Sequence, residues 1–431
     1  MEAPRIPRRL WLWAVVLGLT GQLTWTIENM YLNVFVYETI TDNAAVLATL
    51  VAASAFAATV ATFLAGAWSD RTGRRKRFIA LGYIAWGLST AAFGLVDVGF
   101  LHRLAPAADA VVLAVIAIVL IDCVMSALGA TANDAAFNAW VTDSTDEHNR
   151  GRIDGVLSTF PLLAMLIVFG ALDPLTQQGQ WRTFFGILGA LTVLVGLAAL
   201  VWLRDAGSPR PSGSYLSTVI NGLRPTSVRA NPRLYLTLAA WAVLGSSTQV
   251  FIPYLIIYVT RFLRIDNYPI VLAATLIGAA VVGVLGGRVI DRVGADRTLL
   301  PAMGCYVVGL LAMFIARNPL TVIASGIVVL GFFMVGGAAL AVAVRNLTPP
   351  RRAGEVQGLR MIAMVLIPML VGPWIGAAVI SGAAETYVEL GVVRQVPTPW
   401  IFPAAAAVAV LILIPARLLR HTPTPDLMES R

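Results

Sequence analysis

Twelve apolar stretches of about twenty residues each follow one another along this chain of 431 residues. An α-helix needs ~20 apolar residues to cross the hydrocarbon core of a bilayer, and each stretch is close to that length. Only 13% of the residues are charged, which excludes a soluble globular protein, because soluble domains have about a quarter. We therefore predict an all-α polytopic membrane protein with twelve transmembrane helices. The predicted spans are residues 11–37, 46–67, 78–97, 110–140, 153–173, 182–203, 233–260, 269–290, 298–316, 320–345, 356–380 and 400–417.

The cationic residues are distributed unevenly between the two sides of these spans. The amino-terminal tail, every second connection and the carboxyl-terminal tail carry most of the 31 Lys and Arg residues. The opposite side has six of them: Arg103, Arg182, Arg261, Arg264, Arg317 and Arg394. Cytoplasmic loops carry the excess of Lys and Arg, so we predict that both termini of this multi-pass protein of the cell (plasma or inner) membrane are cytoplasmic. The cationic cytoplasmic loops then account for the net charge of +8. The expected partner is the lipid bilayer, and no nucleic-acid partner is expected.

A short motif occurs twice, about half a chain apart. GAWSDRTG begins at Gly66 and GRVIDRVG begins at Gly287, and both follow the pattern Gly-x-x-x-Asp-Arg-x-Gly. The connection between spans six and seven is rich in Pro, Ser, Gly and Arg, which is typical of a linker. These features predict a duplicated protein. Its parts are an amino-terminal six-helix bundle at 1–203, a cytoplasmic linker at 204–232, a carboxyl-terminal six-helix bundle at 233–417 and a cytoplasmic tail at 418–431.

The first copy of the motif lies between spans two and three and is followed by Arg74-Arg75. This extended motif, together with twelve spans in two halves, resembles the major facilitator superfamily. Arg71-Thr72-Gly73-Arg74-Arg75 looks like the signature of sucrose:proton symporters. AFNAWVTDSTDEHNRGR, residues 136–152, is similar to the stretch after span four in glycoside–pentoside–hexuronide:cation symporters, although drug exporters carry similar loops. The resemblance implies the major facilitator fold, with two pseudo-symmetric bundles, and cation-coupled uptake of a sugar or glycoside.

Two acidic residues, Glu28 and Asp122, lie inside apolar spans. Ionisable residues at membrane depth cost ~2.5–3.5 kcal/mol on insertion scales and usually mark either function or a paired partner. Both lie roughly 15–18 Å from the outer ends of their spans, and the resemblance places spans one and four around one cavity. We predict that they couple transport to a cation; the alternative is a structural acid paired with an Arg. Residues 46–67 contain no acid, unlike span two of melibiose-type sodium symporters, which favours the proton over sodium.

Polar residues recur every three or four positions on spans one and four, so they form stripes along one helix face. Such stripes supply donors and acceptors for hydroxyl groups, and the aromatic residues supply a surface for the apolar face of a sugar. The same residues could instead join packed helices. Pro253 predicts a kink in span seven. The predicted substrate-binding residues are Gln22, Trp25, Asn29, Tyr31 and Asn33 on span one, Ser126 and Asn133 on span four, and Gln249, Tyr254 and Tyr258 on span seven.

The two motif copies predict a cytoplasmic gate. The resemblance implies that Asp70 faces the start of span eleven and that Asp291 faces the start of span five, which closes the cytoplasmic side in the outward-open state. Positive-inside topology alone explains the cations, but it does not explain two Asp residues at matched positions. The predicted gate residues are Gly66, Asp70, Arg71, Gly73, Arg74, Arg75, Asp134, Arg150, Arg152, Gly287, Asp291, Arg292, Gly294, Arg351 and Arg352.

These patterns predict a secondary active transporter rather than an enzyme, working by alternating access with a small-molecule substrate. No Gly-x-x-x-x-Gly-Lys loop occurs, so ATP is not the expected energy source. No cluster of Cys and His has metal-ligand spacing, and we expect no cofactor, no metal and a monomer. Proton-coupled symport of a sugar or glycoside is the preferred function. The alternatives are a proton-coupled drug or lipid-like exporter and a transporter-fold ligand sensor.

Overall fold

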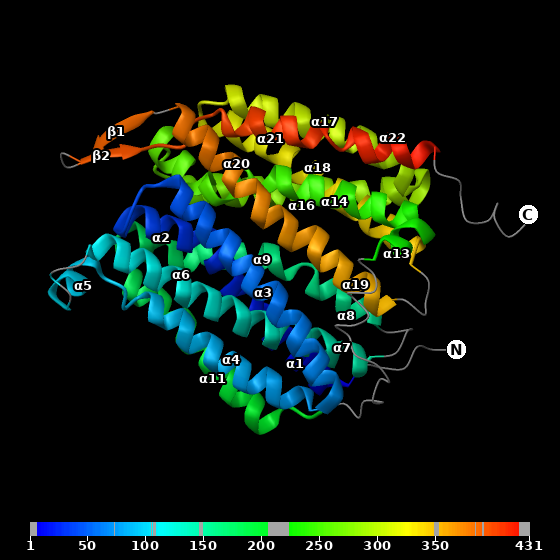
Figure 1. Ribbon diagram of the computed structural model, residues 1–431, viewed down its shortest axis with the longest axis horizontal. Helices are drawn as coiled ribbons and strands as arrows, with labels where there is room; N and C mark the ends of the chain where they lie inside the picture. The colour runs from blue at the N-terminus through cyan, green and yellow to red at the C-terminus, as the bar shows by residue number, and fades with distance from the viewer. Residues whose placement is uncertain are drawn as a thin grey trace, which may run out of the picture. The chain divides into compact units, whose positions relative to one another are not determined.

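The computed structural model describes residues 7–72, 74–104, 106, 109–145, 150–205, 224–348, 353–383, 385–389 and 392–421. The chain forms two compact units, Met1–Leu216 and Ser217–Arg431. Both units are built from long helices, which confirms the predicted all-α membrane fold (Figure 1).

The first unit contains six long helical segments, three of which include a π-helical turn. The first segment consists of α1 (Arg8–Thr26), η1 (Ile27–Tyr31) and α2 (Leu32–Thr39). Next come α3 (Ala44–Thr72), α4 (Arg75–Phe93) and the short α5 (Val98–Leu104). The fourth long segment consists of α6 (Ala110–Gly129), η2 (Ala130–Phe137) and α7 (Asn138–Asp143). The last two consist of α8 (Arg150–Leu157), α9 (Phe160–Ile167), η3 (Val168–Leu172) and α10 (Asp173–Gln177), and then α11 (Trp181–Trp202).

The second unit repeats this plan after the short helix α13 (Pro225–Ala230). Its first long segment consists of α14 (Pro232–Gln249), η4 (Ile252–Tyr254), α15 (Leu255–Ile257) and η5 (Tyr258–Phe262). Then follow α16 (Tyr268–Val293), α17 (Ala295–Ile315) and α18 (Pro319–Asn346). The next segment consists of α19 (Ala353–Met361), η7 (Ile362–Leu366) and α20 (Ile367–Ala383), and after it come β1 (Thr386–Glu389), β2 (Val392–Gln395), α21 (Ile401–Val410) and α22 (Leu413–His421).

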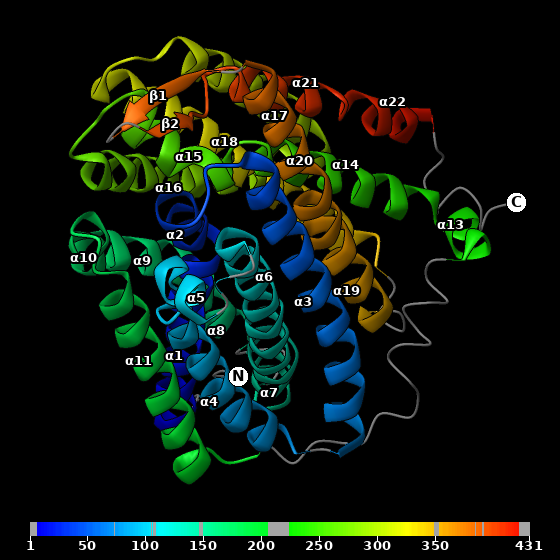
Figure 2. The ribbon, with the colours of Figure 1, turned by 60° about the vertical axis from the view of Figure 1, so that its left-hand side comes forward.

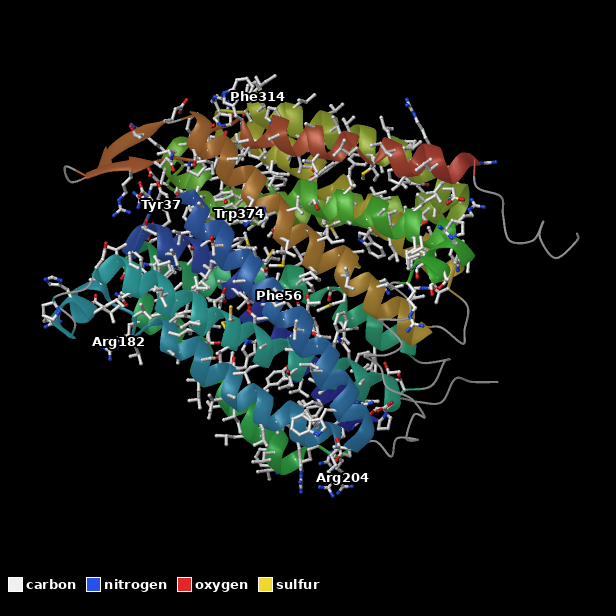
Figure 3. The ribbon with its side chains drawn as sticks, in the orientation of Figure 1. Tyr37, Phe56, Arg182, Arg204, Phe314 and Trp374 are labelled. Atoms are coloured by element: carbon white, nitrogen blue, oxygen red, sulfur yellow. The ribbon has the colours of Figure 1, made fainter. Side chains whose placement is uncertain are left out.

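The lengths and hydropathies of these helices fit membrane spans. Eleven helices in the described part of the chain are long and apolar enough to cross a bilayer. The remaining predicted span is α4, whose first turn carries Arg75, Lys76 and Arg77 and therefore lowers its mean hydropathy. In α11 the apolar segment lies between Arg182 near its start and Arg204 just past its end (Figure 3). Cationic residues at both ends of an apolar helix are expected when the helix spans the hydrocarbon core.

Two connections contain secondary structure that was not predicted from the sequence. The loop between spans eleven and twelve contains an antiparallel hairpin, in which Thr386 pairs with Gln395 and Glu389 pairs with Val392. The loop between spans three and four contains α5.

The predicted kink in span seven is present, because the α-helix ends at Gln249 and a 3₁₀ turn begins at Ile252, next to Pro253.

Glycine residues set the contact between α4 and α11, which lie against each other in the first unit (Figure 2). A Cβ atom on Gly87 would lie 2.5 Å from the backbone oxygen of Gly189, and one on Gly189 would lie 2.6 Å from the oxygen of Gly87. The two backbones therefore touch at a point that only glycine permits. Close approach of small residues is how helices associate where lipid removes the usual hydrophobic driving force.

Gly87→Ala should destabilise the protein by about 1–3 kcal/mol, because the new methyl group meets backbone atoms that cannot move aside as a side chain does. Gly186→Ala on α11, the helix against which Gly87 packs, is the control, since a Cβ there meets nothing within 4 Å. The control should be neutral or stabilising by up to ~1 kcal/mol through helix propensity. Apparent thermal unfolding midpoints in detergent measure both, and equal midpoints for the two variants would contradict the packing argument.

Candidate functional site

The first span widens at Glu28. This residue lies in the π-helical segment η1, and its side chain is only 6% exposed. Its Oε1 accepts a hydrogen bond of 2.5 Å from the Ser126 hydroxyl of α6. Its Oε2 is buried and has no hydrogen-bond partner among the residues that the structure describes. π-Helical turns are found disproportionately at functional sites, and here one carries a buried carboxyl group.

Asp122 lies one turn before Ser126 on α6 and is 1% exposed. Its Oδ1 also lacks a hydrogen-bond partner within the described ranges. Asp122 and Glu28 interact electrostatically, and the Ser54 hydroxyl of α3 faces both carboxyl groups. The structure therefore brings the two acidic residues together at the junction of η1, α3 and α6. We call Glu28, Ser54, Asp122 and Ser126 the carboxyl cluster.

Neither acid of the carboxyl cluster forms an ion pair in the described part of its own unit. The ion pair found there joins Arg75 of α4 to Asp143 of α7, with 3.2 Å between Nε and Oδ2. The alternative of a structural acid neutralised by an Arg of the same unit is therefore disfavoured for Glu28 and Asp122. Ser54 was not anticipated from the sequence, because it lies in a run of Ala and Val without a polar stripe.

An aromatic and polar surface lies one turn from the carboxyl cluster. The Trp25 ring packs against the Trp86 ring of α4, with 5.2 Å between their centroids. Trp25 also lies against the carboxylate of Asp134 in η2, and both side chains are partly exposed. Gln22 and Asn29, on the same stripe as Trp25, are partly exposed as well. We call Gln22, Trp25, Asn29 and Asp134 the polar surface.

Three other predicted ligands of this unit are buried within it. Asn133 is buried, accepts a hydrogen bond of 3.0 Å from the Tyr83 hydroxyl and donates one of 3.1 Å to Asp134. Tyr31 is fully buried and donates a hydrogen bond of 2.7 Å to Asp173. Asn33 is 1% exposed, its Nδ2 donates a hydrogen bond of 3.5 Å to the Asn29 carbonyl, and its Oδ1 has no hydrogen-bond partner among the described residues. These three side chains face the interior of the unit, and Asp173 is a buried acid that was predicted only as the end of a span.

The predicted residues of span seven are divided in the same way. Gln249 is partly exposed and contacts Gly372 of α20. Tyr254 is fully buried and donates a hydrogen bond of 2.8 Å to the Pro373 carbonyl. Tyr258 is fully buried and stacks on Phe262, with 5.3 Å between ring centroids. Gln249 is thus the one of the three with an accessible polar group within its own unit.

Arg360 of α19 makes a contact that was not predicted from the sequence. Its guanidinium lies over the Trp241 ring of α14, 5.2 Å from the centroid. An Arg at the third position of the apolar stretch Gly358–Ala383 was a signal in the sequence, because a charged residue at that depth needs a partner. An aromatic face supplies one through the cation–π interaction.

The gate residues are described in part. Arg75, which is 5% exposed, forms an ion pair with Asp143 of α7 and donates a hydrogen bond to the Ser69 hydroxyl of α3. Asp291 and Arg292 are exposed, and Gly294 ends α16 with φ of +93°, which favours glycine. Gly66 and Gly287 lie inside α3 and α16, Arg74 is exposed before α4, and Asp134 belongs to the polar surface. Gly73, Arg351, Arg352 and the side chains of Asp70, Arg71, Arg150 and Arg152 lie outside the described residues.

The sequence matches the family model of the Major Facilitator Superfamily over residues 10–268 and 265–431. The chain belongs to the major facilitator superfamily. Membership of this superfamily, with its many apolar helices, makes the chain a multi-pass membrane transporter and not an enzyme. No curated protein matches the chain.

Solved structures of major facilitator transporters share the fold. The nucleoside transporter NupG matches with a TM-score of 0.70 and 14% identity, over 96% of this chain and 99% of NupG. A bacterial homologue of the human lysosomal transporter Spinster matches with a TM-score of 0.67 and 18% identity, over 96% of this chain and 97% of that one. At these identities the similarity shows the fold, and the substrate of this transporter must be inferred from its own residues.

Proposed function

We propose that this transporter couples the uptake of a neutral, hydroxylated solute of the sugar or glycoside class to the entry of protons. The observation that supports the proposal best is the carboxyl cluster, in which Glu28 and Asp122 are buried side by side without a cationic partner in the described part of their unit. Two buried carboxylates that face each other repel, and one proton shared between them removes that repulsion. Ionisable groups at membrane depth are expected to serve transport when no cation neutralises them.

The hydroxyl groups of the cluster complete the proposed proton site. Ser126 donates to Glu28 Oε1, and the free Glu28 Oε2 and Asp122 Oδ1 are the atoms that can take up a proton. In the proposed cycle the cluster binds a proton from the outside, alternating access exposes it to the cytoplasm, and the proton leaves there. Span two offers no further carboxylate for a sodium ion, so the proton remains the preferred coupling ion over sodium.

The polar surface is the proposed contribution of the first unit to substrate binding. Trp25 offers an aromatic face of the kind on which the C–H surface of a sugar ring packs. Gln22, Asn29 and Asp134 offer the amide and carboxylate groups that hydrogen-bond to hydroxyls. Gln249, which is partly exposed within the second unit, is the proposed polar contact of span seven. Nucleosides are glycosides of a base, so they belong in the panel of candidate substrates.

Purified transporter in proteoliposomes tests this proposal. Addition of disaccharides, simple glycosides, nucleosides and cationic dyes, one at a time, should give alkalinisation of the medium with at least one hydroxylated solute and with no dye. Protein-free liposomes provide the control for passive leakage. Movement of a dye against the proton flow, with no alkalinisation by any hydroxylated solute, would instead identify a proton-coupled exporter. Saturable binding of a solute without any flux would identify a sensor.

A further inference from the structure

A cavity unrelated to the carboxyl cluster lies at one end of the second unit. Its volume is about 680 Å³, and it is lined by Arg233, Asp296, Arg297, Leu300, Pro301 and Leu419. These residues come from the first turns of α14 and α17 and from the last turns of α22. The distribution of cations along the sequence predicts that this end of the helices faces the cytoplasm. The cavity therefore lies at the level of the lipid head groups.

The charges around the cavity favour an anion. Arg233 and Arg297 contribute two guanidinium groups, and Asp296 contributes one carboxylate on the exposed surface. The amino-terminal ends of α14 and α17 add the positive ends of two helix dipoles, which also accounts for an acidic residue in the first turn of α17. Within the described residues, the buried Nε atom of Arg233 has no hydrogen-bond partner. An unpaired guanidinium N–H of this kind is matched by an oxygen of a phosphate group.

The apolar lining indicates that the anion carries a hydrocarbon tail. Leu300, Pro301 and Leu419 form one side of the cavity, next to the two guanidinium groups. On the adjoining helix α22, Leu413 is 40% exposed and Ile414 is 59% exposed, so the unit leaves an apolar face of this helix uncovered. A free phosphate ion would gain nothing from these side chains. A phospholipid would place its phosphate near Arg233 and Arg297 and its acyl chains along α22.

We propose that this cavity is a binding site for the head group of an anionic phospholipid of the cytoplasmic leaflet. Basic pockets between transmembrane helices on that side suit such head groups, because the phosphate is recognised electrostatically at the membrane surface. The site is independent of the transport reaction proposed above. It would join α14, α17 and α22 at the lipid surface through a ligand, in addition to the direct packing of α14 against α22.

Native mass spectrometry of the full-length transporter tests this proposal. The probes are phosphatidylglycerol and phosphatidylcholine with identical acyl chains, titrated into detergent-purified protein. Wild type should retain one phosphatidylglycerol with at least ~10-fold higher affinity than phosphatidylcholine, as expected for a charge-assisted contact. Arg233→Gln combined with Arg297→Gln should reduce the affinity for phosphatidylglycerol by about tenfold or more. Arg288→Gln, an exposed cation of α16 outside the cavity, should leave it unchanged.

Asp296→Asn provides a second test that does not depend on the folding of the double variant. Removal of the one negative charge at the cavity should raise the affinity for phosphatidylglycerol severalfold, whereas loss of folding would lower it. Equal retention by wild type and the double variant would overturn the proposal, as would an equal loss in Arg288→Gln. Full displacement of phosphatidylglycerol by inorganic phosphate would overturn it as well, because the site would then recognise the ion alone.

Discussion

Asp122→Asn should abolish accumulation of substrate against its gradient and leave exchange of substrate across the membrane intact. Asn has the shape of Asp but cannot exchange a proton, so the variant removes the coupling group from the carboxyl cluster while preserving the packing of this buried position. With one proton per neutral substrate, a membrane potential of 100 mV supplies about 2.3 kcal/mol and supports ~50-fold accumulation. The variant should reach a ratio of about one under the same conditions. Uptake and counterflow of labelled substrate in proteoliposomes measure the two activities separately.

Asp109→Asn is the matched control for this variant. Asp109 caps the outer end of the same helix, α6, and its side chain accepts hydrogen bonds from the backbone of Val111 and Val112. Asn caps helices about as well as Asp, so this variant changes the same functional group on the same helix at an exposed position. It should accumulate substrate like wild type. Accumulation by Asp122→Asn at the wild-type ratio would remove Asp122 from the coupling mechanism.

Glu28→Gln should likewise separate substrate movement from proton movement. The Gln side chain can still accept the hydrogen bond from Ser126, so the geometry of η1 is retained while the ionisable group is lost. Substrate should still exchange, but its addition should no longer alkalinise the medium. Accumulation should fall from ~50-fold at 100 mV to about one.

Ser126→Ala is the converse of Glu28→Gln, because it removes the hydrogen bond that the Gln variant keeps and leaves the carboxyl group in place. If Glu28 acts through its proton, Ser126→Ala should keep substrate-dependent alkalinisation, with an altered dependence on external pH. If instead the hydrogen bond between α6 and η1 is what matters, Ser126→Ala should lose exchange and accumulation, whereas Glu28→Gln should keep both. That second pattern would assign Glu28 a structural role.

The sequence carries enough information to predict the helical membrane fold and the depth of the two acids. Hydropathy is a property of local composition, and a residue's distance from the end of a span follows from the helix rise alone. For that reason Glu28 and Asp122 were placed at similar depths before any tertiary contact was known. Whether Glu28 and Asp122 face each other depends on which sides of spans one and four turn inward. The orientation of these spans was inferred from the family resemblance and not from the periodicity of the sequence.

Contacts between distant helices could not be predicted from a single sequence. Asp173 looked like the polar end of a span, yet it is fully buried and receives a hydrogen bond from Tyr31. Asp143 at the end of α7 forms an ion pair with Arg75 at the start of α4, 68 residues away along the chain. In both cases several residues of suitable charge or polarity are available in the sequence. The choice among them is made by helix packing, which hydropathy and motif spacing do not report.

The π-helical turn at residues 27–31 has a consequence for the shape of the first span. A turn of this kind holds one residue more than an α-helical turn, so the helix beyond it is rotated by about 100° relative to a regular continuation. Trp25 before the turn lies against Trp86 of α4, whereas Phe35 after it packs against Trp181 and Phe185 of α11. The two halves of this continuous helix, one on each side of the wide turn, thus pack their aromatic residues against different helices. If the wide turn moved by one position along the chain, the side chain at the position it left would rotate by about 100° around the helix axis. Both ends of the helix would keep their contacts.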